Sequence, residues 1–410
     1  MSTRARILAA LLAATAHLAV LAPLVDGHSV IVGPVFQPEA EAVLDGALPY
    51  RERGFEYPPL ALPLLLAPAL LAEDPTSYRE AFSWEMIAFD LAIVALLAFG
   101  LRAGTARVTS SLLVYSAGVF ALSGFLLPDS VLDASLPLAR FDLVPAALVL
   151  AAVLARQAGR SATWSALLAA GGAVKGYPLL LYPVLLRGEQ RLARVAIAAA
   201  LPLIVAAVGV LAAGDRFGSA ISYQAGRDLQ IESVAATPLL LAHLFGTPAG
   251  VEVGGGSYNL DAPGGEAARA ISIALLVLSY LLVVWVAWRS DASPLPAAAA
   301  VLAVAVIFAP VLSPQFLVWL LPVSAAAFGL RVHNLALLAA VVATQVMLDH
   351  YDQLSELDAS FIVPLSIRNG LLVCYLALVV LSLRSGSPAG PGWVRRSPSD
   401  RPAEAVPRLT

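Results

Sequence analysis

Charged and polar side chains gather at a few points between the apolar runs of this chain, and their types suit the handling of a phosphate group. The stretch LARFDLVP contains Arg140 and Asp142, and YQAGRDLQIES contains Arg227 and Glu232. Guanidinium groups bind phosphate through paired N–H donors, whereas a carboxylate can accept a proton. Structural ion pairs use the same residue types. The residue types therefore leave both interpretations open.

Lys175 is the only lysine in the chain and stands where an apolar run is interrupted. Gly176, Tyr177 and Pro178 follow it directly, so we expect a broken helix whose end presents the ammonium group near a cavity. A charge at the middle of a bilayer costs roughly 2.5–3.5 kcal/mol on insertion scales. A lysine at a helix end can also extend to the interface without any further role.

Two further stretches place polar groups at the ends of apolar runs. APVLSPQFLVWLLP contains Ser313 and Gln315 beside a proline that frees backbone carbonyls, and MLDHYDQ contains His350. A histidine at such a position can shuttle protons, although a hydrogen-bonded interfacial histidine is the commoner case. We treat His350 as a candidate catalytic residue.

Several signatures of metal and nucleotide chemistry are missing from the sequence. It contains no HExxH, CxxC, Walker A or DxD motif, and GGAVKGYP differs from a phosphate loop because its lysine precedes the glycine. The single Cys374 excludes a disulfide within the chain. We expect no metal site, no cofactor and no nucleic-acid partner.

The composition indicates that these residues belong to a membrane protein. Of 410 residues, 59% are hydrophobic and 13% are charged, whereas globular domains carry about a quarter charged residues. We predict an all-α, polytopic membrane helix bundle with about 10–12 crossings. The two short segments next to Lys175 either cross or form a re-entrant pair. The expected crossings are residues 7–25, 82–101, 108–127, 141–156, 161–174, 176–186, 195–214, 267–288, 294–312, 313–330, 335–350 and 361–383.

The distribution of charge predicts the orientation of the chain. With the N-terminus in the cytoplasm, most arginines fall on cytoplasmic turns and most acids fall on the other side, in agreement with the positive-inside rule. We expect a multi-pass protein of the plasma membrane with both termini in the cytoplasm. Long loops usually carry function. The long outer loops are residues 26–81, 128–140, 215–266 and 351–360.

Short elements are expected in these loops, and a tail is expected at the end of the chain. VFQPEAEAVLDGAL has apolar residues at helical spacing from Phe36 and predicts a helix that ends at Gly46, either interfacial or simply solvated. The glycines of residues 250–265 predict a hairpin or lid. We divide the chain into a membrane domain, residues 1–384, and a disordered cytoplasmic tail, residues 385–410.

Several stretches, taken in order, resemble glycosyltransferase family 87. They are GALPYRERGFEYPPLALPLLLAPALL, ARFDLVPAALVLAAVLA, AVKGYPLLLYPVLLRGEQR, GRDLQIES and LSPQFLVWLLP. The resemblance extends over about residues 7–385 and leaves out the tail.

The resemblance implies a GT-C type membrane glycosyltransferase with its active site on the extracytoplasmic side. It implies transfer of mannose from a polyprenyl-phosphate donor to a lipid or glycan acceptor of the cell envelope, with inversion at the sugar carbon. Such a transfer needs a carboxylate that takes the acceptor proton and cations that stabilise the departing phosphate. The expected donor-phosphate and substrate-binding residues are Arg140, Asp142, Lys175, Arg227, Glu232, Ser313 and Gln315.

One position departs from the family pattern. The resemblance implies an aspartate that serves as the catalytic base, about four residues before the aromatic residue that begins the first-loop helix. In this chain Val32 occupies that position, four residues before Phe36. Asp26 and Glu56 are the acids that can replace it. Alternatively, the chain is a catalytically silent member that binds polyprenyl lipid or scaffolds envelope enzymes. A transporter or flippase is a further alternative, against which the lack of internal repeats argues.

Overall fold

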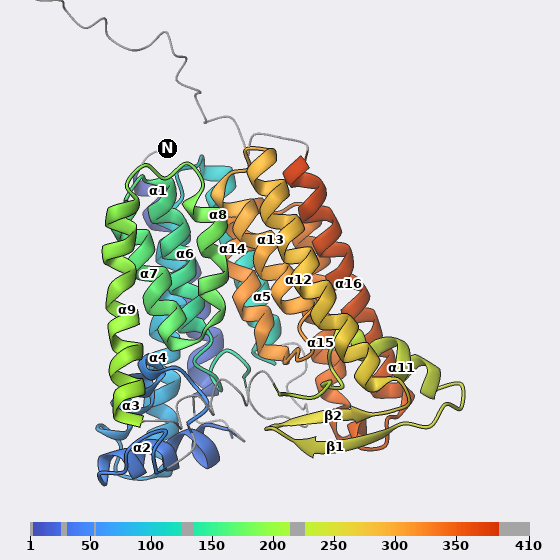
Figure 1. Cartoon of the computed structure of the whole chain (residues 1–410). Coiled ribbons are helices and arrows are strands. Elements are labelled where there is room, and N and C mark those ends of the chain that lie inside the picture. Colours follow the sequence, from blue (N-terminus) through green and yellow to red (C-terminus); the bar gives the residue numbers. More distant parts are fainter. Residues whose placement is uncertain (1–2, 26–30, 53–54, 125–134, 214–225, 385–410) are drawn as a thin grey trace, which may run out of the picture.

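The protein is a bundle of helices that run up and down between two ends, with a two-stranded sheet at one end (Figure 1). The predicted tail lies outside the described part of the chain. A computed structural model describes residues 3–25, 31–52, 55–124, 135–213 and 226–384.

Within the described residues, six segments are helical, long and apolar enough to cross a membrane. They are Thr3–Leu24 with α1 (Thr3–Leu21), Pro75–Gly100 with α4 (Pro75–Ala95), α5 (Thr105–Leu122), α12 (Gly265–Arg289), α15 (Val332–Asp349) and α16 (Ala359–Arg384). Further apolar helices are α6 (Leu143–Gln157), α7 (Ser161–Val174), α8 (Tyr182–Leu186), α9 (Leu192–Ala213), α13 (Pro294–Ile307) and α14 (Leu317–Phe328). Each expected crossing contains a helix, and the predicted all-α polytopic membrane bundle is confirmed.

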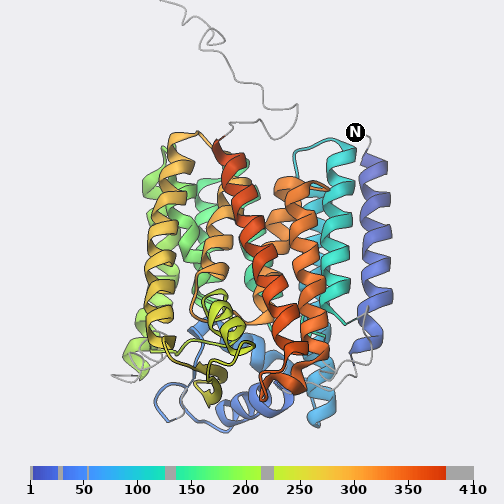
Figure 2. The same cartoon turned by 90° about the vertical axis from the view of Figure 1, so that its right-hand side faces the viewer.

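The alternating direction of these helices brings their connections together. The helices α4, α6, α12, α14 and α16 begin at one end of the bundle, where α1, α5, α7, α13 and α15 finish (Figures 1 and 2). We call it the loop end; it is the lower end in Figure 1, opposite the N-terminus. Polar stretches far apart in sequence therefore reach the same end. They are the stretches around Arg140, Lys175, Gln230, Ser313 and His350.

Short elements lie at or beside the loop end. They are η2 (Val32–Phe36), α2 (Gln37–Leu44), α3 (Leu62–Ala69), α11 (Thr237–His243) and the antiparallel strands β1 (Gly250–Gly254) and β2 (Ser257–Asp261). The helix predicted from Phe36 and the predicted hairpin are confirmed. Gly46 follows α2 with a φ of +96°, a conformation that glycine adopts without strain. Whether α2 lies at the membrane interface remains a prediction.

A glycine sets the close packing behind Lys175. After α7 ends, η5 (Tyr177–Leu181) turns back along it. A Cβ atom on Gly172 would lie 2.4 Å from Cδ2 of Leu179, so a larger residue would require the Leu179 side chain to move. Small residues allow such an approach in membrane bundles. The glycine thus holds the break at Lys175 against the body of α7.

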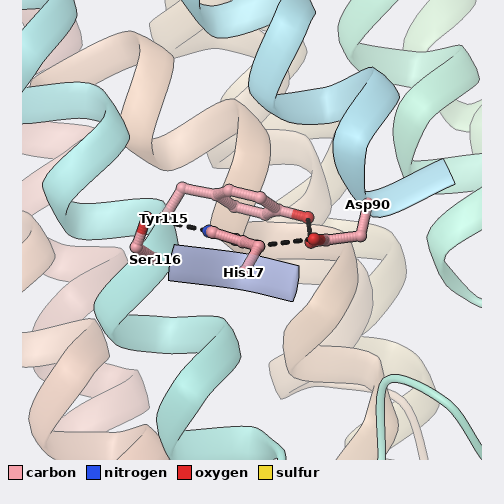
Figure 3. A network of polar contacts seen from close by, with 4 residues as sticks. All are labelled: His17, Asp90, Tyr115 and Ser116. Atoms are coloured by element: carbon pink, nitrogen blue, oxygen red, sulfur yellow. Dashed lines mark hydrogen bonds and ion pairs between the residues drawn. The ribbon is translucent and has the colours of Figure 1, made fainter. Parts of the chain in front are cut away.

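A polar network inside the bundle attaches α1 to α4 and α5 (Figure 3). Nδ1 of His17 lies 2.5 Å from Oδ2 of Asp90, and Nε2 lies 2.8 Å from Oγ of Ser116. The hydroxyl of Tyr115 donates to Oδ1 of Asp90 at 2.6 Å. The other buried residue of α1 is Leu21. Ionisable side chains in a membrane bundle need such partners. This network attaches α1 in its second half, while Arg6 near its start donates to the carbonyls of Leu101 at 3.0 Å and Ala103 at 2.6 Å.

Replacing His17 by leucine should destabilise the protein, because the fully buried Asp90 then keeps Tyr115 as its remaining partner. Removing one partner of a buried pair costs about 3–5 kcal/mol. The double variant His17→Leu/Asp90→Leu should be less destabilised, since it leaves no uncompensated buried charge. Thermal unfolding in detergent measures both variants. A double variant less stable than His17→Leu would contradict this account.

Candidate active site

The centre of the loop end is a carboxylate that accepts hydrogen bonds from two distant donors. Asp142, which precedes α6, accepts at Oδ1 from Nζ of Lys175 at 2.7 Å and from Nε1 of Trp319 at 2.5 Å. Asp142 is buried, whereas 18% of the Lys175 side chain is exposed. The ammonium group is therefore paired, and part of the lysine side chain is accessible.

Aromatic rings surround this ion pair. The ring of Trp319 stacks on Tyr177 at 4.0 Å and on Phe316 at 4.1 Å between ring centroids. Nζ of Lys175 lies 5.2 Å from the centroid of Trp319, 5.3 Å from that of Phe316 and 5.5 Å from that of Phe141. Ring faces attract cations at such distances. The rings therefore help to fix the position of the ammonium group.

Arg140 and Arg227 add positive charge beside the pair. Within the described residues neither guanidinium forms an ion pair, and Nε of Arg227 is buried without a hydrogen-bond partner. Burial raises the pKa of Tyr57 to about 12, while both arginines lower it, and Glu56 and Asp142 raise it further. Charges from separate loops thus surround Tyr57, and two of the cations have no carboxylate partner among the described residues.

A second buried carboxylate belongs to the loop after α9. Glu232 is fully buried, and it accepts hydrogen bonds from Nε2 of Gln230 and, at 3.4 Å, from the hydroxyl of Tyr351. Burial raises the pKa of Glu232 to about 7, and the nearby charges of Arg368 and Arg140 oppose this rise. Arg140 therefore acts electrostatically on Tyr57 in one loop and on this carboxylate in another.

The loop that carries Arg227 and Glu232 is held by hydrogen bonds from several elements. These bonds involve the backbone of the loop. Nε of Arg269 donates to the carbonyl of Arg227 at 2.8 Å, and the N–H of Leu260 donates to the carbonyl of Leu229 at 2.8 Å. The N–H groups of Gln230 and Ile231 donate to the carbonyls of Pro310 and Tyr258, both at 3.0 Å. From α16, Nη2 of Arg368 donates to the carbonyl of Glu232 at 2.6 Å, and Nδ2 of Asn369 donates to that of Ser233 at 3.2 Å. The loop is therefore a fixed part of the bundle.

Three of the predicted residues border the cluster of polar and aromatic side chains described above, which is centred on Asp142, Lys175 and Trp319. Ser313 and Gln315 lie in the turn around η7 (Pro314–Phe316), immediately before the stacked rings. Gln315 is buried and Ser313 is half-buried. Glu56 is exposed beside Tyr57, on whose pKa its charge acts. All three are close to the cluster in the chain, and their roles remain predictions.

The candidate proton acceptors have other surroundings. Asp26 lies outside the described residues. His350 directly follows α15, and its Nδ1 donates to the carbonyl of Val346 at 2.9 Å. Val32 is 1% exposed within η2, four residues before Phe36, whose ring packs against that of Phe141. The position where a base is expected is therefore in the core.

Two residues of the cluster were not singled out by the sequence analysis. Trp319 lies four residues after Gln315, which places both on one face of a helix. Arg368 is a fully buried charge in the middle of the apolar span α16, and such a charge is itself a signal of a functional or structural site.

The comparison with known families identifies the class of protein. The fold is that of a multi-pass membrane protein, and the candidate site residues that the structure describes lie at one end of it. The model of glycosyltransferase family 87 matches residues 55–314, which is more than half of the chain and includes Asp142 and Lys175. The chain belongs to this family and is a membrane glycosyltransferase. No curated protein matches it.

The raised pKa of Glu232 predicts a pH dependence of stability. The folded-state pKa of Glu232, about 7, lies above the ordinary value of 4.5. The protonated carboxyl therefore makes its full contribution to the free energy of unfolding below about pH 4.5. This contribution is lost as the pH rises through about 7. Between about pH 4.5 and pH 7 the protein should therefore lose thermal stability relative to Glu232→Gln, which cannot ionise, and above about pH 7 the difference should stay constant. Parallel curves of unfolding temperature against pH for the two proteins would contradict this expectation.

Proposed function

We propose that this glycosyltransferase transfers mannose from a polyprenyl-phosphate donor to a lipid or glycan of the cell envelope, with inversion at the sugar carbon. The observation that carries the proposal is a group of three cations of which two have no ion-pair partner: Arg140 and Arg227 form no ion pair within the described residues and stand beside the paired, partly accessible Lys175. A phosphate that leaves the sugar develops negative charge, which preorganised cations stabilise.

The chemistry of the side chains suggests how the work is divided. The two guanidinium groups can each bind phosphate oxygens with two donors, whereas the ammonium of Lys175 acts as a point charge. The stacked rings of Trp319 and Phe316 offer an apolar surface beside these cations. A donor that joins an anionic phosphate to an apolar chain matches that combination.

The proposal includes the topology and the domain organisation. Both termini are placed in the cytoplasm, so the loop end and the site lie on the extracytoplasmic side of the plasma membrane, in agreement with the arginine distribution. Residues 1–384 then act as one catalytic membrane domain. The partners are the polyprenyl-phosphate donor, the acceptor and the surrounding lipids.

A second candidate function is a catalytically silent member of the family that binds polyprenyl lipid or scaffolds envelope enzymes. The observation in its favour is Val32, which is buried where the base is expected and cannot accept a proton. The alternatives differ in one measurement. Membranes that contain the protein are incubated with labelled polyprenyl-phosphate mannose and a panel of envelope acceptors; binding of the donor without transfer supports the silent member.

Arg140→Gln and Arg227→Gln should each weaken donor use. A hydrogen bond to a charged group contributes about 1.5–3 kcal/mol, so the KM for the donor should rise about 10-fold to 100-fold. The assay is transfer from labelled donor at varied concentration. Arg194→Gln is the matched control, because Arg194 is exposed near the start of α9, away from the loop end. If activity and thermal stability fall together without a change in KM, the arginines are structural.

The identity of the base is tested by Asp26→Asn, Glu56→Gln and Val32→Asp. Loss of the general base should lower the transfer rate by about 10²–10⁴. A loss confined to Asp26→Asn identifies Asp26, which we favour because it follows the first crossing as the family pattern implies. A loss confined to Glu56→Gln identifies the other acid. Activity that appears only with Val32→Asp shows that the natural chain has no base.

A further inference from the structure

A stretch of the long loop between α9 and α12 is unlike the rest of that loop in composition. Residues 233–251 contain no Asp, Glu, Lys or Arg, and Glu232 and Glu252 bound the stretch. Loop residues in water are usually polar or charged. The stretch forms η6 (Val234–Ala236), α11 and the turn before β1. An uncharged stretch of this length is expected to contact an apolar surface.

The contacts of α11 place it level with the first turns of two membrane spans. Leu240 belongs to a buried cluster with Phe361 and Leu365 of α16, and Asn369 Nδ2 donates to Oγ1 of Thr237 at 2.7 Å. Since α16 begins at Ala359, these contacts lie about 3–15 Å along the span. On the other side, Leu239 approaches Gly264, the residue before the span α12. Both neighbours indicate the depth at which hydrocarbon begins.

Figures 1 and 2 show the same arrangement from two directions. In Figure 1 α11 lies beside the loop end of α16, and its connection to β1 extends away from the bundle. In Figure 2 the yellow-green coil lies in front of the helices, near their lower ends. α11 therefore projects sideways from the bundle and does not extend its end.

The outward tip of α11 is apolar and held in place by its backbone. Gly246 has a φ of +96° and ends the helix, and its N–H donates to the carbonyl of His243 at 2.9 Å. The N–H of Thr247 donates to the carbonyl of Ala242 at 3.2 Å. The helix end thus presents its side chains in fixed positions. The exposed apolar side chains are Phe245 (90% exposed), Leu241 (38%) and Leu244 (37%).

We propose that residues 237–247 form an interfacial anchor, which inserts Phe245, Leu241 and Leu244 among the headgroups and upper acyl chains of the surrounding lipid. Helices that lie in the plane of the membrane interface bury Trp, Phe and Leu side chains at that depth. The partner is a lipid surface, because the adjoining spans already define its level. The anchor is independent of the donor and acceptor that the enzyme uses.

The anchor has a consequence for the site. Asn369 bonds both to Thr237 at the start of α11 and to the carbonyl of Ser233 in the loop that carries Glu232. The lipid-facing helix and the site loop are therefore fastened to one residue of α16. The membrane surface thereby sets the height of that loop.

The anchor can be tested with single cysteines in a Cys374→Ser background. Each cysteine carries an environment-sensitive fluorophore, and the protein is reconstituted into phosphatidylcholine–phosphatidylglycerol vesicles with nitroxide-labelled lipids of shallow or deep label position. Phe245→Cys should show blue-shifted emission and stronger quenching by the shallow label, about 5–10 Å into the interface. Its unfolding temperature should match that of the parent, since the side chain is almost entirely exposed.

Two control positions calibrate the result. Leu278→Cys is on α12 and 63% exposed, so the deep label should quench it most. Val253→Cys is 79% exposed on β1 and should remain in water, without quenching by either lipid. Behaviour of Phe245→Cys like that of Val253→Cys overturns the anchor. Disulfide crosslinking between two chains at Phe245→Cys, without quenching by lipid, identifies a second copy as the partner and also overturns it.

Discussion

One oxygen atom, Oδ1 of Asp142, connects three segments that are far apart in the sequence. It receives the ammonium of Lys175 from the break after α7 and the indole N–H of Trp319 from α14. Inside a bundle of low polarity, neither the lysine nor the carboxylate can be buried without its partner except at a high cost in free energy. Trp319 in turn provides the ring on which Tyr177 and Phe316 stack. The arrangement of the loop end therefore depends on this carboxylate.

The two buried carboxylates of the site are stabilised in different ways. Asp142 has a cation at hydrogen-bond distance, whereas the carboxylate of Glu232 receives donors from the neutral Gln230 and Tyr351. Asp142 is thus held by charge, and Glu232 by its loop and by charges at longer range. A protonation change at Glu232 therefore alters the charge of the site without breaking the Asp142–Lys175 ion pair.

Much of the fold could be predicted because the length of an apolar run is tied to the thickness of a bilayer. The alternating direction of successive crossings also predicts that the polar stretches lie at the same end of the bundle. The contacts could not be predicted: Asp142 and Lys175 are separated by 33 positions, and nothing in their types selects this pairing over others. The hydrogen bond from Trp319 depends on the direction of one side chain. Arg368 was overlooked because a long apolar run tolerates a single charge. Asp26 stays a prediction, since it lies outside the described residues.

The attachments of α1 through Arg6 and His17 fix its position along the membrane normal. Lipid chains are as apolar as leucine, so an apolar helix gains little from exchanging lipid for protein neighbours and could slide along the bundle. A shift of one turn would move His17 by about 5.4 Å and break its contacts with Asp90 and Ser116. The network therefore fixes the depth of the first helix relative to α4 and α5. The chain continues from α1 to η2, whose last residue, Phe36, is buried in the core. The position of α1 along the membrane normal therefore also sets the distance between the end of α1 and Phe36.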